Sequence, residues 1–377
     1  MKNTFGSSVC LTIFGESHGP AIGAVLDGLC AGLPVDEAFI ARQMDKRRAR
    51  GDGLSTGRTE ADQVRLLSGV LNGRTTGTAI ALMIENKAQR SGDYAKTQDL
   101  LRPGHADFTA YAKYGGWQDS RGGGHFSGRI TAPLVAAGAI CQQVLAAKGI
   151  TIATHIRAAA GVEDLPFAAD EPALLARQAA AVSAASPEQL ALIDPAREES
   201  MRAAIRAAGA EGDSVGGILE TVVTGLPAGV GEPWFDSVES ELSHLMFAIP
   251  ACKGVEFGAG FAFAGLRGSE ANDAFTMQNG VVRTATNRNG GVNGGITNGM
   301  PLVFRTVIKP TPSIYKQQHT VDFASKQDAE LQIKGRHDPC IVPRAAVVQN
   351  TLTAFGLLDL LTVRYGTLAQ KHGLPQK

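Results

Sequence analysis

Residues 344–370 read RAAVVQNTLTAFGLLDLLTVRYGTLAQ, and this stretch predicts a long amphipathic helix in the C-terminal part of the chain. Gly356 lies inside it, and an exposed glycine in a helix costs about 1 kcal/mol relative to alanine. We therefore expect Gly356 to mark a close contact with a second helix. Residues 134–149, LVAAGAICQQVLAAKG, predict another helix, made largely of small residues and ended by Gly149.

Two segments of the sequence have the residue pattern of β-strands. Residues 64–86, VRLLSGVLNGRTTGTAIALMIEN, predict two strands joined by a turn at Asn72-Gly73. Residues 253–308 are also strand-like and rich in glycine and asparagine. Because runs of strands and runs of helices do not alternate regularly, we predict an α+β fold with a single interwoven domain over residues 1–377.

Two other segments are expected to be helical. Asp36 has the position of an N-cap for a helix that begins at Glu37, with its acidic residues first and its basic residues last. Residues 165–210 are alanine-rich and predict a peripheral helical elaboration of the domain, with its helices facing solvent.

The composition limits the class of protein. The 377 residues hold 36 basic and 36 acidic side chains, and this balance disfavours a general nucleic-acid surface. The five cysteines are scattered without a CxxC motif, so neither a disulfide framework nor a metal site is expected. The first residues, MKNTFGSSV, lack the apolar segment of a signal peptide, and the apolar runs are too short to span a bilayer. A soluble cytoplasmic protein is expected.

GESHG, residues 15–19, matches the G-x-S-x-G pattern of a nucleophile elbow, with Ser17 at its centre. Such an elbow needs a strand, a sharp turn and then a helix, whereas Pro20 and the strand-like AIGAVLDGL follow here. The pattern leaves two interpretations open. The segment is either the nucleophile turn of a serine hydrolase or a glycine turn with a capping serine, and the missing helix favours the second.

Two further turns carry groups that suit anionic ligands. In RPGHAD, residues 102–107, His105 stands at a predicted helix start near an arginine and is a candidate proton donor to an anion. RGGGHFSGRITAP, residues 121–133, places three glycines ahead of a predicted helix, where exposed N–H groups favour phosphate. Each has a structural alternative: a hydrogen-bonded core histidine in the first, and a tight turn against another backbone in the second.

Two proline-containing turns complete the set. KPTPSI, residues 309–314, presents Lys309, and GRHDPC, residues 335–340, presents Arg336 together with Asp338, which is suited to orienting a neighbour. Taken alone, each of these two segments is more typical of a structural turn than of a binding or catalytic site. Taken together, separated turns that present Arg, His, Ser and Lys are typical of an enzyme that binds a multiply anionic ligand.

These strings, in their order and spacing, resemble the chorismate synthase family from residue 5 to about residue 360. The resemblance rests on GESHG, RPGHAD, RGGGxxSxRxTA, KPTxS and GRHDPC. It implies a β-α-β sandwich, with helices between antiparallel sheets, assembled as a homotetramer. It also implies the anti-1,4-elimination of phosphate from 5-enolpyruvylshikimate 3-phosphate, giving chorismate. Reduced FMN (FMNH2) is the implied cofactor, and the partner is the small-molecule substrate, with no nucleic acid and no membrane.

The resemblance also assigns roles to residues. His18 is expected to protonate the leaving phosphate, and His105 to act on the flavin side. Residues that assist proton removal at the flavin are Ser17, Ser127 and Asp338. The substrate anions are expected to meet Arg47 or Arg48, Arg102, Arg129 and Arg336. The expected FMN-binding residues are His125, Phe126, Ser127, Ala251, Gly294, Lys309, Pro310, Thr311, Pro312, Ser313 and Arg336.

The chain departs from the family pattern in its glycine loop. Many members have RGGGRSSARETA, whereas His125 and Phe126 stand here in place of the basic and the small polar residue. Residues 165–210 match no functional motif of the family. The sequence leaves open whether the protein reduces its own flavin with NADPH, and whether it is instead a flavin protein without synthase activity.

Overall fold

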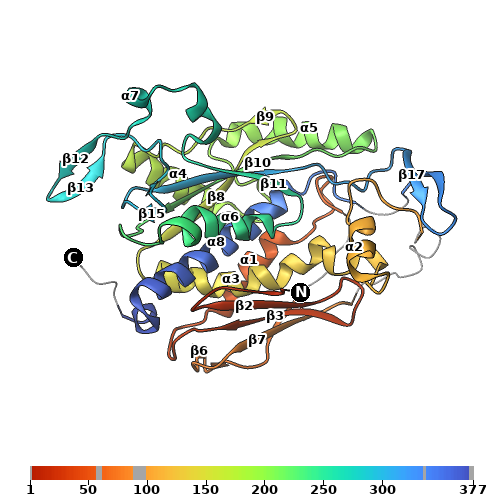
Figure 1. Cartoon of the computed structure of the whole chain (residues 1–377), viewed down its shortest axis with the longest axis horizontal. Coiled ribbons are helices and arrows are strands. Elements are labelled where there is room, and N and C mark those ends of the chain that lie inside the picture. Colours follow the sequence, from red (N-terminus) through yellow and green to blue (C-terminus); the bar gives the residue numbers. More distant parts are fainter. Residues whose placement is uncertain (1, 57–61, 88–98, 334–336, 373–377) are drawn as a thin grey trace.

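Two antiparallel sheets enclose a layer of helices in the computed structural model, which describes residues 2–56, 62–87, 99–333 and 337–372 (Figure 1). The first sheet has five strands in the order β1-β2-β3-β7-β4. Their bounds are Thr4–Phe5 (β1), Cys10–Gly15 (β2), Ala21–Asp27 (β3), Ile80–Glu85 (β7) and Val64–Leu66 (β4). The second sheet has the order β11-β16-β10-β8-β9. Its strands are Cys252–Phe257 (β11), Leu302–Ile308 (β16), Gly217–Thr224 (β10), Thr151–Ala159 (β8) and Val162–Glu163 (β9). This arrangement confirms the α+β class and the sandwich of helices between antiparallel sheets.

Four helices fill the space between the sheets: α1 (Glu37–Arg47), α3 (Thr131–Ala146), α6 (Val238–Phe247) and α8 (Val342–Tyr365) (Figure 1). The prediction that the C-terminal helix is amphipathic is wrong, because 94% of its most apolar window is buried. A helix with sheets on both sides has no solvent face, so it is apolar all round. The segment Gly128–Ala146, which includes α3, is 78% buried, and both helices are long and apolar enough to cross a membrane by composition. Because both helices are mostly buried inside the fold, their high hydropathy is that of core helices.

The glycines of the two central helices lie at helix contacts. A Cβ on Gly138 of α3 would come within 2.4 Å of the Thr351 carbonyl oxygen of α8. A Cβ on Gly356 would lie 2.5 Å from Leu245 Cδ1 of α6, which confirms the contact predicted there. The same helix α8 holds a buried carboxylate, Asp359, that accepts backbone N–H bonds of 2.7–2.8 Å from Ser7, Ser8 and Val9.

The local turn and cap signals are largely confirmed. Asp36 caps α1 by accepting from the Phe39 N–H, and the helix ends at Arg47. Asn72 and Gly73 form the predicted turn, but it joins only the two-residue strands β5 (Val70–Leu71) and β6 (Arg74–Thr75). The prediction of two strands over residues 64–86 is therefore wrong: β4 and β7 join the main sheet, and a separate small hairpin lies between them.

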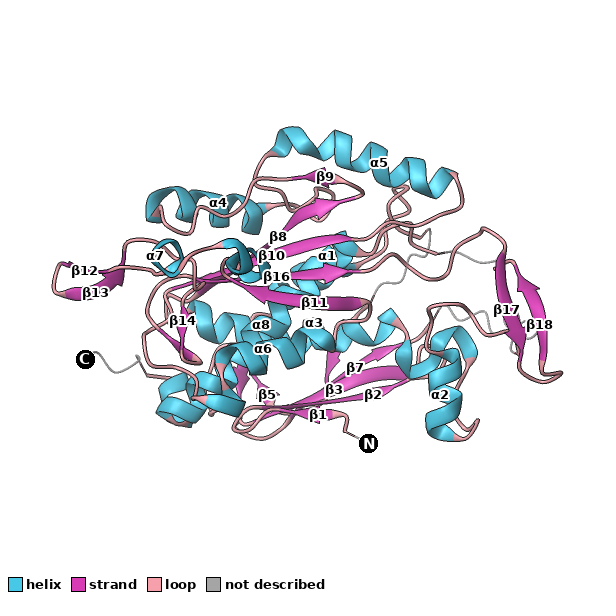
Figure 2. Cartoon of the chain, turned by 45° about the horizontal axis from the view of Figure 1, so that its top comes forward, coloured by secondary structure: helices cyan, strands magenta, loops and turns pink. Residues whose placement is uncertain are grey.

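Helices α4 (Pro172–Ala184) and α5 (Glu198–Ala210) lie on the outer side of the second sheet (Figure 2). They form the helical elaboration expected over residues 165–210, but they do not simply face solvent. Leu175, Ala179 and Val182 of α4 form a small core with Val222 and Val303 of the sheet. This segment therefore covers a sheet face that would otherwise be exposed.

The remaining elements are short and lie at the edges of the sandwich (Figure 2). They are the helices α2 (Asp107–Tyr114) and α7 (Gly268–Ala271) and the hairpins β12–β13 (Phe275–Gln278 and Val281–Thr284), β14–β15 (Val292–Asn293 and Ile296–Thr297) and β17–β18 (Gln318–Asp322 and Gln327–Leu331).

A buried histidine joins the second sheet to the elaboration. His155 of β8 is fully buried, with Nδ1 3.0 Å from Asp164 and Nε2 2.9 Å from Glu220. Asp164 also accepts the backbone N–H groups of Ile193 and Asp194. Burial alone would lower the pKa of His155, but its hydrogen bonds to the two carboxylates raise it. Because both ring nitrogens face acceptors, the protonated imidazole satisfies the geometry best.

We expect the free energy of unfolding to depend on this proton. A raised histidine pKa contributes stability below the unfolded pKa, about 6.5, and loses it as the pH rises through the folded value. Denaturant unfolding from about pH 6 to pH 9 should therefore show a steeper loss of stability in the wild type than in His155→Gln. His319→Gln, at a side chain that is 96% exposed, is the control. Parallel curves for the wild type and His155→Gln would contradict the expectation.

Candidate active site

GESHG forms the turn between β2 and β3, which are adjacent antiparallel strands. A hairpin replaces the strand–turn–helix of a nucleophile elbow, which removes the structural basis for a serine hydrolase at Ser17. The Ser17 hydroxyl donates to the Arg121 carbonyl at 3.2 Å, so its oxygen accepts from His18 Nδ1 at 3.1 Å. In this arrangement Nδ1 of His18 carries a proton, so Nε2 is the ring nitrogen that can gain or lose a proton. The His18 side chain is buried.

The glycine loop packs directly on both candidate histidines. Gly122, Gly123 and Gly124 all have positive φ, at 61°, 93° and 53°. A Cβ on Gly122 would lie 2.0 Å from His18 Cε1, and a Cβ on Gly123 would lie 3.3 Å from His105 Cε1. Only glycine permits both the backbone conformation and this approach. The loop therefore brings together two histidines that are 87 residues apart in the sequence.

Hydrogen bonds from the glycine loop, one from a side chain and one from the backbone, hold the GESHG turn in place. His125 Nδ1 donates to the Gly15 carbonyl at 2.8 Å, and the Ser17 N–H donates to the Gly124 carbonyl at 3.1 Å. Ser127 accepts from the Arg129 N–H at 3.2 Å. Phe126 is 38% exposed and packs edge-on against Tyr114 at 6.2 Å between ring centroids. His125 is thus occupied on its Nδ1 side by the turn.

His105 is held by a carboxylate. Its Nδ1 lies 2.8 Å from Asp107 Oδ1, and Arg102 contacts both oxygens of Asp107, with Nη2 at 2.6 Å and Nε at 2.8 Å. Burial alone would raise the pKa of Asp107, but the hydrogen bonds from Arg102 and His105 hold it well below its usual range. Asp107 is therefore ionised at neutral pH and fixes the orientation of the imidazole.

The KPTPSI turn lies against the His105 turn. Lys309 Nζ donates to the Gly104 carbonyl at 2.6 Å, and a Cβ on Gly104 would lie 3.4 Å from Pro312 Cβ. The Lys309 N–H donates to the Ala251 carbonyl at 2.9 Å, so Ala251 belongs to the same neighbourhood. Thr311 Oγ1 is buried and has no hydrogen-bond partner within the part of the chain that the structure describes.

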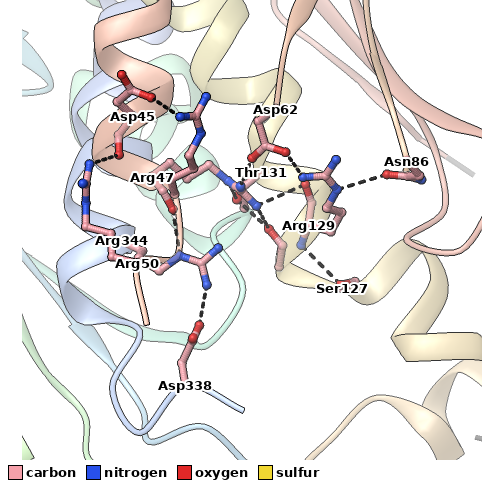
Figure 3. Close-up of polar contacts among 12 residues, drawn as sticks. Asp45, Arg47, Arg50, Asp62, Asn86, Ser127, Arg129, Thr131, Asp338 and Arg344 are labelled. Carbon is pink, nitrogen blue, oxygen red and sulfur yellow. Dashed lines mark hydrogen bonds and ion pairs between the residues drawn. The ribbon is translucent and has the colours of Figure 1, made fainter. Parts of the chain in front are cut away.

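A network of arginines runs behind the glycine loop (Figure 3). Arg47 donates to Asp62 at 3.1 Å, to the Thr131 hydroxyl at 2.9 Å and to the Gly128 carbonyl at 2.9 Å. Arg129 also contacts Asp62. Burial and the neighbouring Arg344 lower the pKa of Arg47 to about 9, against the opposing effect of Asp62, so Arg47 remains a cation at neutral pH.

Asp338 connects to the same network. It accepts the Thr56 N–H at 2.7 Å. It also pairs with Arg344, whose Nε donates to the Arg47 carbonyl at 2.8 Å (Figure 3). Asp338 and Ser313 line a hollow of about 420 Å³ that also includes Tyr315. Asp338 of the GRHDPC turn and Ser313 of the KPTPSI turn thus line the same hollow, and Asp338 is connected through Arg344 to the end of α1.

Three of the predicted site residues are not placed in this assembly by the described structure. Arg48 pairs with Asp45 at 2.8 Å and lines a cavity away from the glycine loop. Gly294 lies in the β14–β15 turn, near the start of β16, whereas Lys309 follows its end. The 7 residues of β16 lie between the two positions in the sequence. A Cβ on Gly294 would meet nothing within 4 Å, so the role of Gly294 in FMN binding stays a prediction, and Arg336 lies outside the described residues.

Comparisons with known proteins agree with one another. The family model for chorismate synthase matches residues 9–362. A chorismate synthase of Dehalococcoides mccartyi (strain ATCC BAA-2266 / KCTC 15142 / 195) is 46% identical over 361 residues, covering 96% of each chain. One from Aeropyrum pernix is 46% identical over 369 residues, covering 98% of this chain and 95% of the relative. The chain belongs to the chorismate synthase family.

A solved structure supports the fold of the family. A crystal structure of a chorismate synthase superposes with a TM-score of 0.75 at 28% identity, covering 96% of this chain and 94% of the other. As a member of this family, the protein is a lyase of the shikimate pathway and of aromatic amino acid biosynthesis. It eliminates phosphate from 5-enolpyruvylshikimate 3-phosphate to give chorismate, in a family that requires a reduced flavin.

Asp62 lies among the candidate site residues, and the sequence interpretation missed it. It is 6% exposed and contacts two of the predicted substrate arginines. A signal was present in α1: Ile40, Met44 and Arg47 recur at helical spacing on one face. That spacing places Arg47 among core residues, and a buried arginine requires a carboxylate partner.

Proposed function

We propose that the meeting place of the glycine loop, the two histidine turns and the KPTPSI turn is the active site, and that its flavin is FMN. The observation that carries this proposal is the contact of one loop with both histidines, at Gly122 and Gly123. The substrate brings a phosphate and two carboxylates, and FMN brings a second phosphate. Each phosphate carries about −1.5 to −2 charges at neutral pH, which the clustered arginines and Lys309 offset.

The donor set of the KPTPSI turn fits FMN. The buried Thr311 hydroxyl has no partner in the described part of the chain, and Lys309 and Ser313 lie in the same turn beside the hollow. We propose that FMN is held by Ala251, Lys309, Pro310, Thr311, Pro312 and Ser313, with His125, Phe126 and Ser127 on the facing loop. Bound there, the reduced flavin supplies an electron-rich ring beside the substrate. The parts of Gly294 and Arg336 in FMN binding stay predictions.

His18 is proposed to be the acid toward the leaving phosphate. Its Nδ1 proton is directed at Ser17, so the proton that His18 gives to a phosphate oxygen in this proposal is the one that Nε2 carries when the ring is an imidazolium. Ser17 orients this ring and does not attack the substrate. Ser127 and Asp338 stand as proposed assistants of proton removal near the flavin.

In this proposal, some arginines position other side chains, and others contact the substrate anions directly. The Arg47 guanidinium donates hydrogen bonds to Asp62, Thr131 and Gly128. Arg47 therefore holds the glycine loop in position, and through Asp62 it also positions Arg129. Arg129, next to Ser127, is the proposed contact to the substrate anions. Arg102 serves chiefly to position Asp107 and His105, and substrate contacts of Arg48 and Arg336 stay predictions.

Replacing Asp107 by asparagine is expected to lower kcat about 10- to 100-fold, because partners that orient a histidine are worth about that much. Asp107→Glu should recover most of the rate. The rate at saturating substrate, with reduced flavin supplied, is the measurement, and Asp170→Asn, at an exposed position, is the control. An unchanged kcat for Asp107→Asn would contradict the role of Asp107.

The activity and the site are tested together by anaerobic assay. Protein, dithionite-reduced FMN and 5-enolpyruvylshikimate 3-phosphate should yield chorismate, followed by its absorbance. His18→Ala and His105→Ala are each expected to lower turnover about 10- to 10⁴-fold, the usual worth of acid–base groups. Wild-type rates in both variants would overturn the site, while an inactive wild type that binds FMN would favour a flavin protein without synthase activity.

Two further properties belong to the proposal. We propose a cytoplasmic homotetramer, supported by large apolar side chains that one chain leaves exposed, such as Trp234 at 85% and Phe235 at 89%. Sedimentation velocity measures the assembly. NADPH is a possible reductant of the flavin, and turnover in air with NADPH as the sole reductant would show that the protein reduces its own flavin.

A further inference from the structure

A second cavity, of about 180 Å³, lies between α1, β8, α8 and the segment that follows α4. Phe39, Gln43 and Lys46 face it from α1, at helical spacing, whereas Arg47 faces the glycine loop. Of the residues that line the hollow beside Asp338, only Ser55 also lines this cavity. Arg48 and Arg344 also line this cavity, and they are paired with Asp45 and Asp338 respectively.

The polar wall of the cavity has unused hydrogen-bonding groups. Gln142 Oε1 is buried and has no partner among residues 2–56, 62–87, 99–333 and 337–372. The Gln43 side chain is 8% exposed and makes no hydrogen bond to the chain over the same ranges. Buried polar groups of this kind are satisfied by water or by a ligand.

Lys46 supplies a charge on the same wall. Its Nζ donates to the Ser183 carbonyl at 3.0 Å and has no carboxylate within 4.0 Å in the described chain, and burial lowers its pKa. The other cations at the cavity are already paired. Arg50 contacts Glu188 at 2.8 Å, and Arg202 contacts Glu198 at 2.7 Å. One ammonium with two amides suits a singly charged anion better than a phosphate.

Apolar side chains also line the cavity, among them Ile152, Val182 and Leu190. An apolar protein cavity of about 150 Å³ is large enough to hold benzene. We propose that this cavity binds a small carboxylate with an apolar body, of about the size of benzoate. The Lys46 ammonium and the amide N–H groups of Gln43 and Gln142 donate to the carboxylate, the Gln142 Oε1 acceptor is left to water, and the three apolar side chains receive the body.

The test is a titration of the intact protein with 4-fluorobenzoate, followed by ¹⁹F NMR and calorimetry. We expect saturable binding at one site. Lys46→Met should weaken binding at least about tenfold, the worth of a charge-assisted hydrogen bond, and 4-fluorobenzamide should bind wild type at least about tenfold more weakly than the acid. Lys253→Met, which removes an exposed lysine outside the cavity, should leave the affinity unchanged.

A second variant fills the cavity. Val182→Phe should abolish binding while circular dichroism and the melting temperature confirm a folded protein, and if it does not fold, the Lys46→Met and benzamide comparisons decide. Absence of saturable binding to the wild type, as for a cavity that holds only water, would overturn the proposal. So would equal affinities for wild type and Lys46→Met. Because binding is measured without substrate or flavin, the result is independent of the proposed active site.

Discussion

Replacing Gly122 by alanine is expected to lower kcat for chorismate formation about 100-fold or more, with the protein still folded. The new Cβ would lie 2.0 Å from His18 Cε1 and 2.3 Å from its Nδ1, so the imidazole must move. A displacement of about 1 Å at a reacting group costs about 10² in rate. The same shift breaks the bond between Ser17 and His18 that sets the tautomer. Steady-state kinetics with reduced flavin supplied measures the effect.

Gly128 offers a matched control in the same loop. A Cβ there meets nothing within 4 Å, and its φ is not in the left-handed region. Gly128→Ala should therefore keep kcat within about twofold of wild type, and by removing a flexible glycine it should not destabilise the fold. If Gly122→Ala retained the wild-type rate, the placement of His18 against the loop, and with it the proposed acid, would be wrong.

Asp62→Ala is expected to lower the free energy of unfolding by about 3–5 kcal/mol, because it leaves a buried arginine without its counter-charge. The Arg47 and Asp62 side chains are each 3% exposed, and Arg129 contacts the same carboxylate. Burial has already lowered the pKa of Arg47, and losing Asp62 lowers it further. Urea unfolding gives the measurement, with activity expected to fall in parallel because Arg129 loses its orientation.

An exposed ion pair on the same helix provides the comparison. Asp45 pairs with Arg48, and their side chains are 39% and 37% exposed. Asp45→Ala should cost only about 0–1 kcal/mol, as surface pairs do. Equal losses for Asp45→Ala and Asp62→Ala would show that Arg47 has access to water and that the network does not depend on Asp62.

The sequence predicted the parts of the site that are made by local turns. GESHG, RPGHAD, RGGG and KPTPSI each contain the glycine or proline that fixes the local backbone, and the fold gathers these turns. The partners of their side chains are set by distant segments, and no local pattern announces them. Asp62 is 67 residues from Arg129, and Asp338 lies 282 residues from the Thr56 N–H that it accepts.

The errors have a common physical cause. Periodicity describes one element in isolation, whereas α8 lies between two sheets and so loses the polar face that a surface helix needs. The alanine-rich helices of residues 165–210 match no functional motif and are expected to face solvent, yet Leu175 and Val182 pack against residues of the second sheet.

The carboxylate of Asp359 has a consequence for the order of folding during synthesis. It accepts the N–H groups of Ser7, Ser8 and Val9 across about 350 residues, and Gln370 similarly accepts the Cys30 N–H at 2.8 Å. The edge of the first sheet therefore waits for the last long helix to leave the ribosome. Until then the first strands remain without their final partners, and such distant contacts slow folding. We infer that the nascent chain depends on protection from aggregation for most of its synthesis.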